Sequence, residues 1–135
     1  MPKQFVFLFI LSFITVHSNS QRFIKDYSCT PIETEAKFKD SANDWNRFLT
    51  DNINAAVPQL NCAPPGTYKT EIRFLIGKDG VVSDVKAMST YGYGMEAEVI
   101  RVINNSPKWI PATHNGRTIR AYRHQSFLFA VSNQL

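Results

Sequence analysis

Few residues of this 135-residue chain carry the chemistry that a catalytic or metal site needs. The two cysteines and the two C-terminal histidines lie far apart in the sequence, at Cys29, Cys62, His114 and His124. Their separations lack the short ligand spacing of a zinc site, and no Ser-His-Asp or Cys-His arrangement is indicated by spacing. We therefore expect no metal, no cofactor and no small-molecule substrate.

Glu96 and Glu98 are close enough in the sequence to be considered as a general acid and base. Residues two apart on a helix point in different directions, so these two carboxylates cannot act on one substrate together. No nucleophile, base and orienting group can be named as a set. The sequence therefore predicts that the protein is not an enzyme.

Cations interleaved with aromatic residues are the feature that would suit nucleic-acid binding, at Lys108, Trp109, Arg117, Arg120, Tyr122 and Arg123. Aromatic and Arg side chains on a sheet can hold single strands. The Gly-aromatic strand motif of RNA-recognition folds is missing, however. We expect no nucleic-acid partner, and we interpret these residues as a solvated strand face.

The N-terminus has the pattern of a secretory signal peptide, with Lys3, an apolar run over residues 5–16, and small residues at Ser18 and Ser20. This pattern predicts cleavage after Ser20 and export to the periplasm. An uncleaved inner-membrane anchor is the alternative, but a spanning helix needs about 20 apolar residues and this run is shorter. No cysteine directly follows the run, which argues against a lipoprotein anchor.

Removal of residues 1–20 would take away Lys3 and leave 14 basic and 11 acidic residues, a formal charge of +3. Such a mild excess favours solubility and weak attraction to anionic surfaces. In an oxidising compartment Cys29 and Cys62 can form one disulfide, which would join the arm of residues 21–37 to the segment before the first long strand. The alternative is two unpaired thiols.

Two helices are predicted by apolar residues that recur at three- and four-residue spacing. The first covers about residues 41–56, with a capping-box-like Ser41 and Asp44 at its start, and Pro58 ends it. The second covers about residues 95–105. The apolar stripes comprise Ala42, Trp45, Phe48, Leu49, Ile53 and Ala56 in the first helix, and Met95, Val99, Val102 and Ile103 in the second.

Three strands are predicted by alternation and turn signals. The first follows Pro64-Pro65-Gly66 and runs to Ile76, and it turns through Asp79-Gly80 into the second, over about residues 81–88. A stiff link, residues 107–111, and an Asn-Gly turn at 115–116 precede the third strand, over about residues 117–131. Polar residues at 123 and 125 interrupt its apolar face, which predicts a bulge or a strand that runs past the core.

The order helix, strand, strand, helix, strand predicts one α+β domain over residues 38–135. Two helices packed on one face of a three-stranded antiparallel sheet would bury all of the apolar stripes together. We assign structural roles in this fold to Trp45, Pro58, Gly66, Trp109, Pro111, Phe127 and Phe129.

The edge of the long final strand is the predicted binding surface, because unpaired backbone groups there can accept an extended peptide as an extra strand. The partner-binding residues that we predict are Arg117, Arg120, Tyr122, His124 and Ser126. Two alternatives are that the arm of residues 21–37 covers this edge, or that a second copy of the chain does so in a homodimer.

Residues 38–131 resemble the C-terminal domain of TonB. The shared features in chain order are Pro58, Gly66, Phe74-Leu75-Ile76, Asp79-Gly80, Glu96-Ala97-Glu98-Val99 with Arg101, Trp109 with Pro111, Asn115-Gly116, and Phe127-Leu128-Phe129. The resemblance implies the same two-helix, three-stranded fold. It also implies a periplasmic module that binds the TonB box of an outer-membrane TonB-dependent receptor, or a similar envelope protein, by strand addition in energy-dependent transmembrane transport.

Some features differ from that family. Val57 stands where a Tyr usually precedes the Pro, and the Ser and His expected four apart in an anchor helix have no match, since Ser12 and His17 are five apart. No Pro-rich linker is recognisable. The alternative function is therefore a structural or dimerising envelope protein that uses the fold without binding a receptor.

Overall fold

The computed structural model describes residues 34–39 and 41–133. The expected signal peptide, residues 1–20, lies outside the described residues, as do Cys29 and most of the expected arm. The Cys29–Cys62 disulfide therefore stays a prediction. Cys62 itself is exposed.

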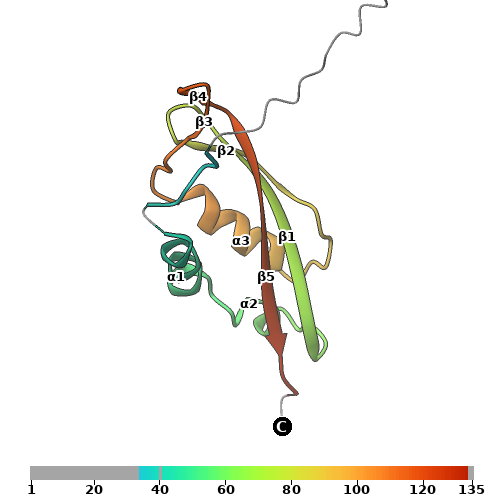
Figure 1. Ribbon diagram of the computed structural model, residues 1–135. Helices are drawn as coiled ribbons and strands as arrows, with labels where there is room; N and C mark the ends of the chain where they lie inside the picture. Colours follow the sequence, from blue (N-terminus) through green and yellow to red (C-terminus); the bar gives the residue numbers. More distant parts are fainter. Residues whose placement is uncertain (1–33, 40, 134–135) are drawn as a thin grey trace, which may run out of the picture.

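Two main helices lie on the same side of a three-stranded antiparallel sheet whose strand order is β2-β1-β5 (Figure 1). This arrangement confirms the predicted α+β fold. A four-residue helix and a small separate hairpin, β3–β4, are additions to it. In chain order the elements are α1 (Ala42–Asn52), α2 (Val57–Leu60), β1 (Gly66–Ile76), β2 (Val82–Ala87), α3 (Met95–Asn104), β3 (Ala112–His114), β4 (Arg117–Ile119) and β5 (Ala121–Val131).

Helix α1 begins as predicted but ends four residues early. The Ser41 hydroxyl accepts a hydrogen bond from the Asp44 amide at 3.3 Å and caps the helix. The helix ends at Asn52, and the next turn is held by the Asn54 amide, which donates to the Glu98 carboxylate at 2.8 Å. Pro58 therefore opens α2, where a missing amide hydrogen costs nothing, instead of ending α1.

Strands β1 and β5 pair without interruption from Gly66 opposite Val131 to Ile76 opposite Ala121. The predicted bulge at Arg123 and Gln125 is wrong. Both side chains stay on the helix side of the sheet, because each finds a polar partner there. The irregularity in the sheet lies instead between Arg73 and Leu75, where β1 pairs with β2.

The predicted strand over residues 117–131 is in fact two strands separated by Arg120. The Asn115-Gly116 turn forms as expected, but it folds Arg117 back onto His114 in the β3–β4 hairpin. Arg117 therefore does not lie on the strand that pairs with β1.

An aromatic cluster fills the core between the sheet and α1. The rings of Trp45 and Trp109 are 4.7 Å apart, and Phe38 and Phe74 also contact them. Of the residues to which we assigned structural roles, Trp45, Pro58, Trp109 and Phe129 are buried, Pro111 and Phe127 are half-buried, and the exposed Gly66 opens β1.

Glu96 is a buried carboxylate that closes the loop before α3. It accepts hydrogen bonds from the Ser89 hydroxyl at 2.9 Å, the Tyr91 amide at 2.7 Å and the Gly92 amide at 3.0 Å. Burial by itself would raise the pKa of Glu96, but these hydrogen bonds outweigh it and lower the pKa below its usual range.

We expect Glu96→Gln to lower the free energy of unfolding by about 2 kcal/mol at neutral pH, because amide hydrogens lose a charged acceptor. A depressed folded-state pKa contributes stability that is present above the ordinary glutamate pKa and is lost as the pH falls through the folded value. The variant should therefore lose less stability than the wild type on acidification. Urea denaturation across acidic and neutral pH checks this, and parallel curves would contradict it.

Candidate functional site

Strand β5 forms one edge of the three-stranded sheet. Within residues 34–39 and 41–133, β1 is the sole strand that pairs with it. An edge of eleven residues presents a long row of backbone donors and acceptors, which favours pairing with another chain.

The pairing of β1 determines which backbone groups of β5 face outward. The Glu71 carbonyl accepts from the Met88 amide at 2.7 Å, and the Glu71 amide donates to the Ser89 hydroxyl at 3.0 Å. The amide and the carbonyl of Glu71 thus both point toward β2 and away from β5. Ser126 lies opposite Glu71 in a pair that exchanges no backbone hydrogen bonds, so its amide and carbonyl point away from β1. The backbone groups of alternate residues along β5 point in the same direction. The outward set is Tyr122, His124, Ser126, Leu128 and Ala130.

The side chains of this outward set lie on the sheet face opposite the helices, and all five residues are exposed. Tyr122 is held in place there. Its hydroxyl donates to the Asp84 carboxylate at 2.9 Å, and the guanidinium of Arg73 lies 4.8 Å from the centre of its ring. Hydrogen bonds from Lys86 and Tyr122 lower the pKa of Asp84, which keeps this carboxylate charged as an acceptor.

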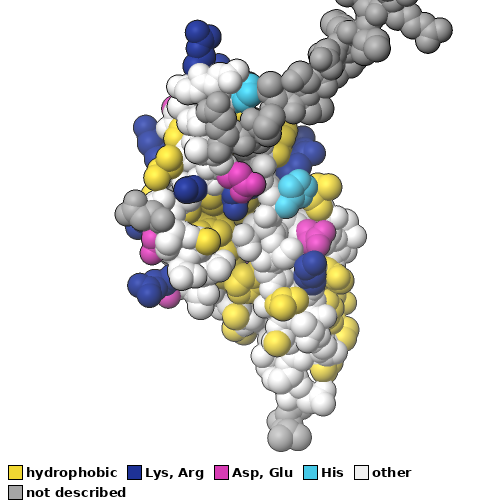
Figure 2. All heavy atoms as spheres, in the orientation of Figure 1, with side chains coloured by type: hydrophobic (Ala, Val, Ile, Leu, Met, Phe, Trp, Pro, Cys, Tyr) yellow, Lys and Arg dark blue, Asp and Glu magenta, His cyan; other side chains and the backbone are white. Residues whose placement is uncertain are grey.

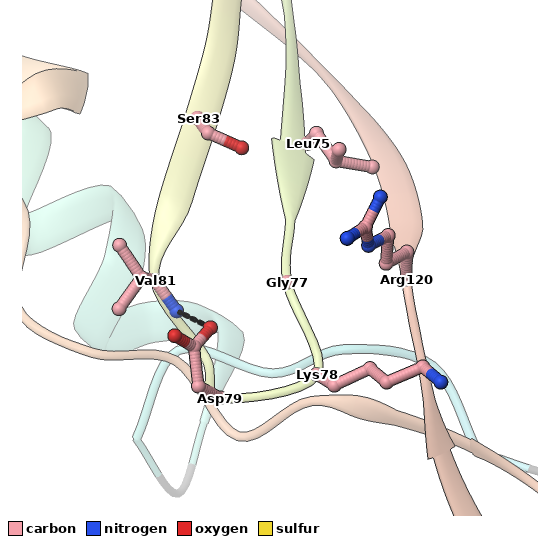
Figure 3. A pocket seen from close by; sticks show the side chains of 7 residues that line it. All are labelled: Leu75, Gly77, Lys78, Asp79, Val81, Ser83 and Arg120. Carbon is pink, nitrogen blue, oxygen red and sulfur yellow. Dashed lines mark hydrogen bonds between the residues drawn. The ribbon is translucent and has the colours of Figure 1, made fainter.

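Arg120 directly precedes β5 and extends the same face beyond the start of the strand. It lines a depression of about 530 Å³ together with Leu75, Lys78 and Ser83. In Figure 3 the guanidinium reaches from the strand toward Leu75, and the Asp79 carboxylate is turned toward the Val81 amide, which donates to it at 3.1 Å. Of the five predicted partner-binding residues, Arg120, Tyr122, His124 and Ser126 thus follow one line, and Arg117 lies apart on β4.

Gln125 is a residue of this site that the sequence analysis did not identify. Its side-chain amide donates to the outward-facing Ser126 carbonyl at 2.6 Å. Its oxygen accepts from the indole nitrogen of Trp45, also at 2.6 Å. The need of a buried indole for an acceptor was the signal that could have identified it. Gln125 thereby joins α1 to the open edge.

Helix α1 flanks the edge on the inner side. A depression of about 400 Å³ runs between them and is lined by Leu49 and Thr50 of α1 and by Phe127 and Leu128 of β5, among others. The Leu128 side chain lies at the same edge on the other face of the sheet, and it is 63% exposed although it is large and apolar. Apolar side chains of an added strand can pack against this part of the edge.

The described part of the expected arm pairs with the 110–113 segment rather than with β5. Thr34 pairs with Thr113, and Lys37 pairs with Ile110. The arm approaches β5 near the start of that strand. There Arg123 donates to the Ala36 carbonyl at 2.9 Å and lies 3.6 Å from the Glu35 carboxylate.

We also searched the part of the chain that the structure describes for a metal site and for a membrane-spanning helix. His, Cys, Asp and Glu side chains do not gather there in groups of three that could hold a metal ion. No helix within the described ranges is long and apolar enough to span a membrane.

Comparison with known families gives one match. Residues 69–131, which include most of β1 and the whole of β2, α3 and β5, match the family described as "Gram-negative bacterial TonB protein C-terminal". No curated protein matches the chain. The matched stretch contains the paired strands β1 and β5 and therefore the open edge.

Proposed function

Residues 69–131 belong to the TonB C-terminal domain family, and from this premise we propose that the chain binds an extended segment of an outer-membrane TonB-dependent receptor as an added strand on β5. Domains of this family are non-catalytic interaction modules that generally act in transport at the bacterial envelope. The observation that carries the proposal is the outward row of backbone groups at Tyr122, His124, Ser126, Leu128 and Ala130.

The added segment would obtain affinity from backbone hydrogen bonds and selectivity from side chains that alternate between two surfaces. Side chains on one face of the segment would pack along α1 beside Leu49 and Phe127. Those on the other face would lie beside Tyr122 and His124. An amide of the partner would replace the Gln125 side chain at the Ser126 carbonyl.

The proposed setting is the periplasm, reached through the signal peptide of residues 1–20. The expected partners are proteins of the envelope, and we propose no cofactor, small-molecule substrate, nucleic acid or catalytic role. A homodimer that pairs two β5 edges would use the same backbone groups, so it competes with receptor binding.

Isothermal titration of residues 21–135 with TonB-box peptides and with receptor plug domains tests this proposal. Saturable binding of a plug domain or a peptide supports it. Sedimentation of the chain alone measures self-association. A stable dimer that binds no plug domain would instead favour the structural envelope protein.

A further inference from the structure

Five cationic side chains gather at the end of the domain where the β1–β2 turn, the 107–111 link and the β3–β4 hairpin meet. Backbone hydrogen bonds join these segments, from the Ile110 amide to the Lys37 carbonyl at 2.7 Å and from the Trp109 amide to the Gly80 carbonyl at 2.9 Å. All five side chains are exposed, and we call them the cationic end: Lys37, Lys78, Lys108, Arg117 and Arg120.

The positive charge at this end is largely uncompensated. The acidic residues near it are Glu35, which faces Arg123 at 3.6 Å, and Asp79, which accepts from the Val81 amide. Among the ion pairs of the described residues, none includes a member of the cationic end.

The opposite end of the domain is uncharged. Residues 52–68, which include α2, and residues 87–95, before the acidic start of α3, contain no Asp, Glu, Lys, Arg or His. On the face drawn in Figure 2, the lower end shows only hydrophobic and uncharged side chains, and the charged ones lie above it. The domain is therefore electrostatically polarised along its long axis.

We propose that the cationic end docks on an anionic lipid surface. Val81 and Ile110 support a lipid partner, because these large apolar side chains are 44% and 49% exposed on the same turn and link. Lys and Arg that flank exposed apolar side chains are the pattern of proteins that bind at a membrane interface. Lipid headgroups are mobile, so they can contact cations that come from separate segments at any spacing.

The course of the chain agrees with this partner. Strand β5 begins beside Arg120 and runs toward the uncharged end (Figure 1). Docking through the cationic end would therefore leave the edge from His124 to Ala130 accessible.

The experiment is co-sedimentation of residues 21–135 with vesicles that mix phosphatidylglycerol and phosphatidylcholine, at low and high salt. The described core lies within residues 36–131, so this chain keeps every core residue. We expect binding at low salt that is lost at high salt. The triple substitution Lys78→Gln, Arg117→Gln and Arg120→Gln should weaken binding about a hundredfold, since each cation contributes about fivefold.

The matched control is Arg47→Gln, Lys69→Gln and Lys86→Gln, which removes the same charge away from the cationic end and should weaken binding far less. Equal loss in the two triple variants would overturn the proposal, as would equal binding to pure phosphatidylcholine. Binding to soluble polyglutamate without binding to vesicles would assign the cationic end to an acidic protein instead. The readout does not involve peptide binding, so strand addition can fail or succeed independently.

Discussion

Ser126→Pro should strongly weaken the binding of an extended receptor segment and leave the domain folded. The Ser126 amide points away from β1, so proline removes no hydrogen bond of the sheet, and edge strands tolerate proline at such positions. The substitution deletes one outward donor and places a ring where the added strand must approach. We expect at least a tenfold loss of affinity, or about 1.4 kcal/mol, in isothermal titration.

Two controls distinguish this effect from damage to the fold. Ser126→Ala keeps the amide and should bind like the wild type. Phe127→Pro moves the proline by one residue, to a position whose amide faces β1. It should lower the free energy of unfolding by about 3 kcal/mol or more. If Ser126→Pro bound peptide as well as Ser126→Ala, the β5 edge would not be the binding site.

Gly80→Ala should destabilise the domain more than a Gly→Ala substitution at any of its other glycines. Gly80 has a φ of +80°, and a Cβ there would lie 2.0 Å from the Trp109 carbonyl oxygen, which is backbone. The Trp109 amide also donates to the Gly80 carbonyl at 2.9 Å, so neither segment can withdraw without losing that bond. We expect a loss of about 3 kcal/mol or more in the free energy of unfolding.

Gly92→Ala is the matched control for Gly80→Ala. Gly92 has nearly the same φ, +78°, but a Cβ there meets no atom within 4 Å. It should cost only the strain of the left-handed backbone, about 1 kcal/mol. Urea denaturation of both variants measures the difference. Equal stabilities would mean that the turn does not pack against the link as closely as described.

Alternation and helical spacing predicted the sheet and α3 well, because one face of each element is strongly apolar. Helix α3 ends at Asn104, one residue before the prediction, and β1 ends at Ile76 as predicted. The alternation rule failed at Arg123 and Gln125. Polar side chains on the inner face of a strand break the alternation in the sequence in the same way as a bulge does. Their partners, the Ala36 carbonyl and the Trp45 indole, lie more than 75 residues away and leave no local signal.

The outward row of the site was partly predictable, since Tyr122, His124 and Ser126 share one parity. Leu128 has the same parity and was missed because an exposed apolar residue resembles core in a sequence. Arg117 was misplaced because β3, a three-residue strand directly after Pro111, has too little pattern to reveal the hairpin. Which edge of the sheet stays open follows from strand order, and strand order depends on contacts between distant residues.

The measurement that tests strand addition most directly is an amide chemical-shift map of residues 21–135 titrated with a TonB-box peptide. Strand addition predicts large shifts, and slower hydrogen exchange, at the amides of Tyr122, His124, Ser126, Leu128 and Ala130. The alternate amides of β5, already bonded to β1, should change little in exchange. Shifts centred on α2 and the loop of residues 89–94, with β5 unchanged, would contradict the proposed site.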